Sequence, residues 1–252
     1  AARRGGAVPV GPIGCCSPSV GLRTRPGLGA FLPRLRPRRL VHQAARLLAP
    51  TGVGVDLCCG SGAVGAALVA LAPGIELHAA DIDPLEVACA RRNLSAPVYE
   101  GDLFSPLPRK LRSRVDLVLA STPYVPTGAI RLLPTEARLH EPWVALDGGE
   151  DGLDVVRRIV LEAMQWLSST GHLLLETSEQ QASSVLMSCS AAGFAARVVR
   201  CAERDATVGV APLESPLAAR RRGPALPDGQ PARPLPARPT PPAAPQGRER
   251  TA

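Results

Sequence analysis

Short apolar runs alternate with longer segments of helical periodicity between about residue 50 and residue 212. The apolar runs predict strands at residues 53–57, 75–80, 97–100, 115–120, 172–176, 196–200 and 206–210. Helices are expected at residues 62–72, 84–94, 152–168 and 178–192, with another beginning after Pro37. Such alternation is typical of a parallel sheet covered by helices on both faces. The sequence therefore predicts an α/β, Rossmann-like fold with a seven-stranded, mostly parallel sheet, which binds ligands at the carboxyl ends of its strands.

The two ends of the chain lack this pattern. Residues 1–36 hold five prolines among many glycines, and residues 213–252 hold ten prolines with arginine and alanine between them. These compositions are typical of irregular or disordered segments. We expect a folded domain at residues 37–212 between two disordered basic tails. Because the first residue is Ala1 rather than Met, we also expect a fragment or a misassigned start.

The charge is unevenly distributed along the chain. A formal net charge of +7 would fit binding to nucleic acid. However, residues 1–49 carry nine arginines and no acid, whereas residues 50–212 carry 13 basic and 19 acidic residues. The predicted folded domain is acidic, and a surface that follows phosphates needs the opposite charge. We therefore expect no specific nucleic-acid partner.

The cysteines and the apolar runs limit the metal sites, disulfides and cellular compartment that we expect. Seven cysteines occur without a C-x-x-C pair or a neighbouring histidine cluster, which argues against a metal site and a disulfide framework. No apolar run approaches the roughly 18 residues expected of a membrane span. We expect a cytoplasmic monomer with no membrane partner and no metal.

A glycine-rich turn follows the first predicted strand. Glycines let the backbone approach a ligand, and the helix that follows offers free N–H groups at its start. The turn lacks the Gly-Lys-Ser/Thr sequence of a phosphate-binding loop. An ordinary strand-to-helix turn explains it equally well. It consists of Cys58, Cys59, Gly60, Ser61 and Gly62.

Acidic residues follow the next two predicted strands. Asp81 ends the second strand, where a carboxylate can accept both hydroxyls of a ribose. Asp83 is expected to cap the following helix, and the two roles are compatible. Asp102 follows the third strand and could accept from an adenine amino group, with Leu103 or Phe104 against the ring. Taken in order, these residues favour a nucleoside-containing cofactor.

A fourth motif, Ser121-Thr122-Pro123-Tyr124, follows the strand expected at residues 115–120. The proline keeps Thr122 extended, so that its carbonyl can point into a cleft. The Ser121 side chain and that carbonyl could accept the two hydrogens of a planar amide or amine. Methyl transfer to such a nitrogen depends mainly on positioning. The alternative is a strand that ends in an ordinary proline turn without a functional role.

The order of these motifs resembles the class I S-adenosylmethionine-dependent methyltransferases. More narrowly, it resembles the HemK-type protein-(glutamine N5) methyltransferases. The resemblance covers about residues 20–212 and is most specific in residues 141–153, EPWVALDGGEDGL, with further similarity in residues 29–34 and 123–126. It implies S-adenosylmethionine as the cofactor. It also implies the Gly-Gly-Gln motif of a peptide-chain release factor as the methylated substrate.

The resemblance also implies roles for individual residues. By position, the cofactor site would comprise Cys58, Cys59, Gly60, Ser61, Gly62, Asp81, Asp102, Leu103 and Ser121. The glutamine side chain would be held by the candidate catalytic residues Ser121, Thr122, Pro123 and Tyr124.

Two departures from the family motif leave alternatives open. The family has Asn where this chain has Ser121, and Pro where it has Thr122. The family's helical docking domain is also not evident in residues 1–49. A homologue that binds the cofactor without catalysis is one alternative. A DNA amino-methyltransferase is another, because enzymes acting on the cytosine amino group use Ser-Pro-Pro-Tyr.

Overall fold

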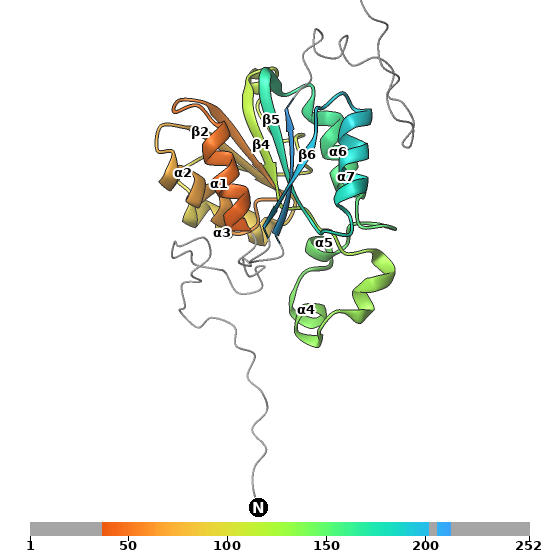
Figure 1. The fold of residues 1–252 in the computed structure, drawn as a ribbon. Helices are drawn as coiled ribbons and strands as arrows, with labels where there is room; N and C mark the ends of the chain where they lie inside the picture. Colours follow the sequence, from red (N-terminus) through yellow and green to blue (C-terminus); the bar gives the residue numbers. More distant parts are fainter. Residues whose placement is uncertain (1–36, 202–205, 213–252) are drawn as a thin grey trace, which may run out of the picture. The chain divides into compact units, whose positions relative to one another are not determined.

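This computed structural model describes residues 37–201 and 206–212. Its strands form one sheet in the order β3-β2-β1-β4-β5-β7-β6 (Figure 1). Strands β1 to β5 are parallel, and β7 and β6 extend the sheet in antiparallel fashion beyond β5. The predicted α/β, Rossmann-like fold with a parallel sheet is confirmed. The predictions for residues 1–36 and 213–252 lie outside the described residues. The strands are β1 (Val53–Leu57), β2 (Glu76–Asp81), β3 (Val98–Glu100), β4 (Val115–Ala120), β5 (Leu167–Thr177), β6 (Arg197–Cys201) and β7 (Ala206–Pro212).

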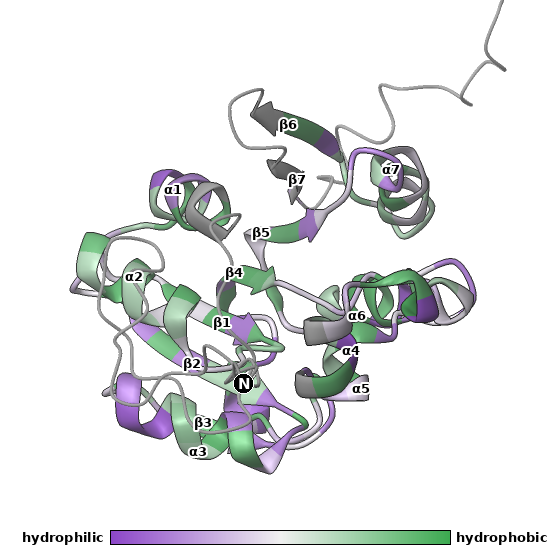
Figure 2. Cartoon of the chain, turned by 90° about the horizontal axis from the view of Figure 1, so that it is seen from below, coloured by the Kyte–Doolittle hydropathy of each residue, from purple (hydrophilic) through white to green (hydrophobic). Residues whose placement is uncertain are grey.

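Helices cover both faces of the sheet, α1 to α3 on one side and α6 and α7 on the other (Figure 2). Side chains alternate along β4: Leu117 and Leu119 join the core under α1 to α3, while Val118 joins the core under α6 and α7. Each such fully buried aliphatic side chain contributes about 1.5–3 kcal/mol. The helices are α1 (Pro37–Leu47), α2 (Ala63–Leu71), α3 (Pro84–Asn93), η2 (Arg109–Leu111), η3 (Thr127–Leu132), α4 (Thr135–His140), α5 (Trp143–Leu146), α6 (Asp154–Ala163) and α7 (Ala182–Ala191).

The helix predicted over residues 152–168 was too long. Helix α6 ends at Ala163, and β5 already begins at Leu167. Trp166, in the turn between them, is buried and stacks on Phe104 with ring centroids 5.5 Å apart. The prediction failed because Ala163, Trp166 and Leu167 keep the apolar spacing of a helix while they actually enter the core from a turn and a strand.

The segment between β4 and α6 contains three short helices that the sequence pattern did not predict. Each begins directly after a proline in the N-cap position, namely Pro126, Pro134 or Pro142, where the missing proline N–H costs no helical hydrogen bond. A parallel bridge between Val125 and Asp147 closes the segment into a loop. The segment therefore leaves the sheet and returns to the carboxyl end of β4.

Within the described ranges, none of the helices is long and apolar enough to cross a membrane. The same ranges contain no group of three or more His, Cys, Asp or Glu side chains placed to hold a metal ion.

Candidate functional site

A cavity of about 350 Å³ opens at the carboxyl ends of the parallel strands. Its lining comes from the loops after β1, β2, β3 and β4, from the end of β2, and from helices α3, α5 and α6. This volume is within the range of sites that enclose small molecules. The predicted site residues that it brings together are Cys58, Gly60, Asp81, Asp102, Ser121, Thr122, Pro123 and Tyr124.

Four other predicted site residues lie outside the lining of this cavity. Cys59 and Ser61 are buried, and Leu103 lies in the core that also holds α6. Gly62 faces α3, where an added Cβ would lie 2.9 Å from Leu94. These four residues therefore support the turn from its core side, and Phe104 is likewise a core residue.

The turn after β1 has an unusual backbone. Cys58 has a φ of 52°, and Gly60 and Gly62 also have positive φ. A positive φ at a residue with a Cβ costs roughly 1–2 kcal/mol, and such strain is concentrated at functional sites. The turn is fixed by the Gly60 N–H, which donates to Asp81 Oδ2 over 2.8 Å. The end of β2 thereby determines the shape of the turn after β1.

Asp81 accepts a second hydrogen bond, from the backbone N–H of Asp83 over 3.0 Å. Burial raises its pKa, although both backbone bonds oppose the shift. A carboxylate has about four acceptor positions, so Asp81 retains capacity for a ligand. Asp83 accepts from Leu85 N–H over 2.8 Å and caps α3, which confirms its predicted capping role.

Asp56 lies beneath the turn and is buried. Its Oδ2 accepts from the Gly65 N–H of α2 over 3.0 Å. Burial raises the pKa of Asp56 to about 8, and the nearby charge of Asp81 adds to the effect. Asp56 is therefore largely protonated at neutral pH and acts as a support for the turn.

Acidic residues dominate the charge of the cavity. The lining contains five carboxyl side chains but only one basic side chain, Arg158. Arg158 forms an ion pair with Asp102, which raises the pKa of the guanidinium. A net negative field of this kind favours a cationic group and disfavours phosphate. The five are Asp81, Asp83, Glu86, Asp102 and Asp147.

Two hydroxyl groups meet the cavity after β4. The Ser121 hydroxyl donates to Glu176 Oε2 over 2.7 Å. The Thr122 side chain is 5% exposed, and its Oγ1 has no hydrogen-bond partner among the described residues. A buried polar group without a partner is costly, and a bound polar ligand would remove that cost. The cavity is therefore suited to a ligand with hydrogen-bonding groups next to Thr122.

Gln181 joins three segments behind Tyr124. Its Nε2 donates to the carbonyl oxygens of Tyr124 over 2.9 Å and Asp151 over 3.1 Å. Gly152 has a φ of +81°, and an added Cβ there would lie 2.3 Å from the Tyr124 carbonyl oxygen. A glycine at position 152 is thus required for close packing against the motif after β4.

Trp143 stands at the edge of the cavity and is 60% exposed. Its indole N–H donates to Asp147 Oδ2 over 2.9 Å, while Asp147 Oδ1 accepts from the Thr127 hydroxyl over 2.6 Å. These bonds, that of Thr127 first, lower the pKa of Asp147. Asp147 therefore orients an exposed aromatic ring beside the candidate site.

Sequence reasoning missed Glu176, Gln181, Trp143 and Arg158. Glu176 ends a predicted strand, as Asp81 does, so the rule that singled out Asp81 also applied to it. Gln181 gave no such signal, because its partners are distant backbone carbonyls.

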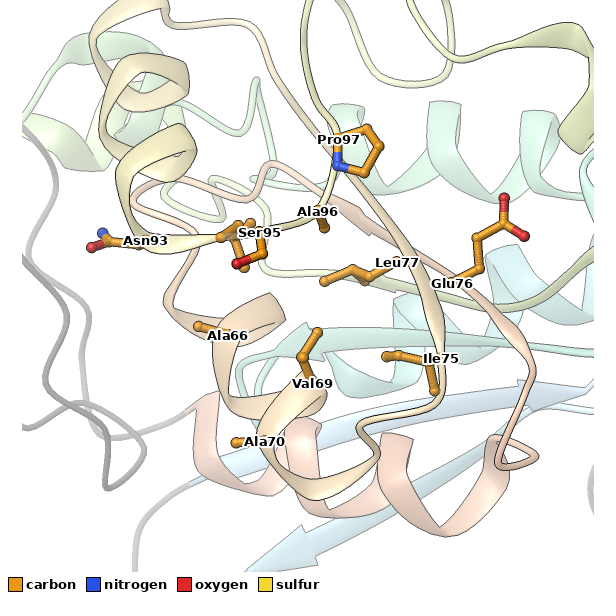
Figure 3. A pocket seen from close by; sticks show the side chains of 11 residues that line it. Ala66, Val69, Ala70, Ile75, Glu76, Leu77, Asn93, Ser95, Ala96 and Pro97 are labelled. Atoms are coloured by element: carbon orange, nitrogen blue, oxygen red, sulfur yellow. The ribbon is translucent and has the colours of Figure 1, made fainter.

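A larger cavity, of about 560 Å³, lies between α2, β2 and the loop before β3 (Figure 3). Figure 3 shows mostly small and aliphatic side chains around it, such as Ala66, Val69 and Leu77, with Glu76 as its charged residue. It lies away from the carboxyl ends of the strands and lacks converging polar groups. The smaller cavity is therefore the better candidate site.

Comparisons with known proteins agree with this architecture. Residues 38–132 match the family described as the methyltransferase small domain. A methyltransferase from Pyrococcus furiosus superposes with a TM-score of 0.57 at 13% identity, over 76% of this chain and 88% of that one. At this identity the likeness concerns the fold alone. The described residues form an α/β methyltransferase fold.

Relatives found by sequence similarity are named as a narrower group of methyltransferases. The release factor glutamine methyltransferase of Geobacter sulfurreducens is 35% identical over 169 residues, 65% of this chain and 58% of that protein. The ribosomal protein uL3 glutamine methyltransferase of Burkholderia pseudomallei is 40% identical over 143 residues, 52% of this chain and 46% of that protein. The chain thus spans about half the length of these relatives. The predicted resemblance is confirmed as a similarity: parts of this chain match proteins named as release factor and ribosomal protein uL3 glutamine methyltransferases.

Proposed function

We propose that this protein is an S-adenosylmethionine-dependent methyltransferase acting on the side-chain amide of a protein glutamine. The substrate would be the Gly-Gly-Gln motif of a peptide-chain release factor. The principal support is that Gly60, Asp81 and residues 121–124 meet in one acidic cavity. Relatives named release factor glutamine methyltransferases support the choice of substrate. The uL3 relative makes a ribosomal protein glutamine the second candidate substrate.

The residues of the cavity fit this cofactor. S-adenosylmethionine supplies a methyl group on a positively charged sulfur, and the acidic lining favours a cation there. Asp81 would accept from the ribose hydroxyls, and Asp102 from the adenine amino group. The turn at residues 58–62, with Leu103 behind it, would support the nucleoside. The Thr122 hydroxyl, which has no hydrogen-bond partner within residues 37–201 and 206–212, offers a further hydrogen-bonding group to a bound ligand.

The residues after β4 would position the substrate nitrogen. Ser121 Oγ and the Thr122 carbonyl would accept its two hydrogens, while Pro123 and Tyr124 flank the planar amide. S-adenosylmethionine, when bound, would supply the methyl group, and its sulfur would keep the electron pair of the sulfur–carbon bond. One N–H proton then leaves to water. Holding the nitrogen in line is the main contribution of the protein.

The segment between β4 and α6, part of which lines the cavity, supports a protein substrate. Leu132, Leu139, Trp143 and Val144 are exposed large apolar side chains in the segment between β4 and α6. Exposed apolar side chains gathered in one segment are typical of protein-binding surfaces. We further propose that residues 37–212 are the catalytic domain, acting as a cytoplasmic monomer without specific binding to nucleic acid.

The direct test is a methylation assay of the full chain with S-adenosylmethionine and a Gly-Gly-Gln peptide, read by mass spectrometry. We expect a gain of one methyl group on the glutamine and none on the matched Gly-Gly-Glu peptide. Calorimetry of the cofactor accompanies the assay. Cofactor binding without transfer would favour a homologue that has lost catalysis. Methylation of a cytosine-containing DNA instead would overturn the protein substrate.

A further inference from the structure

The Ser121 hydroxyl has its hydrogen committed before any substrate arrives. Ala120 of β4 pairs with Leu175 of β5, so Ser121 and Glu176 follow side by side at the ends of the two strands. The Ser121 hydroxyl donates to Glu176 Oε2 over 2.7 Å. Hydroxyl-to-carboxylate bonds are charge-assisted and among the stronger hydrogen bonds in proteins. The hydroxyl is therefore held in one orientation.

A serine hydroxyl has one donor and two acceptor lone pairs. When Glu176 takes the donor, only the lone pairs of Ser121 Oγ can face the cavity that Ser121 lines. An oxygen in this state accepts N–H groups and offers no hydrogen to a carboxylate or carbonyl. A free hydroxyl could rotate and donate, and would thus discriminate less.

We propose that Glu176 is a positioning residue that makes Ser121 an obligate acceptor, so that the site selects a primary carboxamide over a carboxylate. This inference rests on the proposed function. The asparagine of the family motif presents a carbonyl oxygen that needs no such partner. Here Ser121 and Glu176, 55 residues apart, supply the equivalent acceptor together. No bond to either residue forms or breaks during methyl transfer.

The test combines two substitutions in the full chain. Glu176→Gln can donate its amide hydrogens to Ser121 Oγ and thus occupy the lone pairs that the substrate needs. We expect kcat for a Gly-Gly-Gln peptide to fall at least about 10-fold, while the Kd for S-adenosylmethionine stays within about 2-fold. In the Ser121→Asn background, Glu176→Gln should change kcat less than about 2-fold, because an amide carbonyl needs no orienting carboxylate.

Glu179→Gln is the matched control, with the same loss of charge three residues further along at an exposed position. It should leave kcat unchanged. If Glu176→Gln lowers the melting temperature sharply, Glu176→Asp replaces it in the test, because aspartate keeps the charge but has a shorter side chain. Its effect on kcat is then compared in the unmodified and the Ser121→Asn backgrounds.

Two results would overturn the inference in distinguishable ways. An equal loss of kcat in the unmodified and the Ser121→Asn backgrounds would mean that Glu176 acts independently of residue 121, while the proposed function would stand. An unmodified chain that binds the cofactor but transfers no methyl group would remove the proposed function and this inference together.

Discussion

The part of the cavity after β1 and β2 is held together by residues close in sequence, whereas the part after β4 and β5 joins distant segments. In the first part, Gly60 donates to Asp81, 21 residues away. In the second part, Ser121 and Glu176 are 55 residues apart, and Gln181 and Tyr124 are 57 apart. One half is thus a strand–turn–helix unit with its neighbouring strand. The other half requires three separate segments to meet.

This difference predicts how each half of the cavity responds to a substitution. A substitution in the first half should weaken a ligand contact while its short loops keep their shape. In the second half, a substitution that disturbs the packing between segments should displace a whole segment, whereas one that only alters a polar group should leave the segments in place. Four changes test this contrast, beginning with the largest expected effect.

Gly152→Ala should disrupt the second half most. The new Cβ would lie 2.3 Å from the Tyr124 carbonyl oxygen and 2.5 Å from Gln181 Nε2, at a φ of +81°. We expect a loss of about 2–4 kcal/mol in the free energy of unfolding from overpacking and backbone strain. Methyl transfer should be abolished. Urea denaturation and the peptide assay measure the two effects.

Gly128→Ala is the control for this change, because nothing lies within 4 Å of its Cβ position. It should alter the unfolding free energy by less than about 0.5 kcal/mol. Equal effects at the two glycines would show that residues 147–153 do not depend on close packing against Tyr124.

Asp81→Asn should weaken ligand binding in the first half of the cavity without displacing its loops. Asparagine can keep one backbone bond but loses the charge and an acceptor, so the Kd for S-adenosylmethionine should rise about 10- to 100-fold. Calorimetry measures this change. Asp116→Asn is the control: that carboxylate also accepts two hydrogen bonds, from Val53 N–H and the Ser168 hydroxyl, but does not line the cavity. Similar losses in both variants would argue against a ligand role for Asp81.

The same contrast explains what the sequence could predict. The strand that ends at Asp81 and the helix cap at Asp83 are local patterns, so the sequence predicted both and the structure confirms both. The stretch at residues 141–153 was recognised only by its resemblance to a known family. Its reason, the packing of Gly152 against the Tyr124 carbonyl, was not visible. Gln181 was missed because its partners are backbone carbonyls, which leave no trace in side-chain patterns.

Leu103 illustrates the opposite limit. Its position after the third strand suggested a cofactor contact, yet its side chain lies in the core. Position in sequence gives the loop, whereas the direction of a side chain depends on backbone torsions such as the φ of 48° at Leu103. That torsion is not encoded by a local pattern.

A third prediction concerns Asp56, which supports the turn of the first half. Its folded-state pKa is raised to about 8 from 3.8, so the folded state binds a proton that the unfolded state has released. Its contribution to stability is therefore complete below about pH 4 and is lost as the pH rises towards 8. The slope for one proton is at most about 1.4 kcal/mol per pH unit. Urea denaturation between pH 5 and 8 should show this decline in the unmodified chain.

Asp56→Asn has no titrating proton there, and it can still accept from Gly65 N–H. Its unfolding free energy should fall less steeply over the same range. Burial also raises the pKa of Asp81 and produces a decline of the same sign in both proteins, so only the difference between the two slopes reports on Asp56. Parallel curves would mean that Asp56 is ionised in the folded protein.

The smallest expected effect comes from Thr122→Val in the second half. Valine has nearly the shape of threonine and removes a buried hydroxyl that has no partner among the described residues. The free energy of unfolding should rise by about 1 kcal/mol without ligand, because an unsatisfied buried group is removed. If a bound ligand satisfies this hydroxyl, ligand affinity should fall about 5-fold in the same variant. Stability and binding would then change in opposite directions.

Thr127→Val provides the contrast, since the Thr127 hydroxyl already donates to Asp147 over 2.6 Å. Removing that donor should not raise the unfolding free energy, and it should reverse part of the lowered pKa of Asp147. A gain in stability at Thr122 with unchanged affinity would mean that the hydroxyl meets no ligand. In that case the second half of the cavity would use only Ser121 and the backbone to hold its substrate.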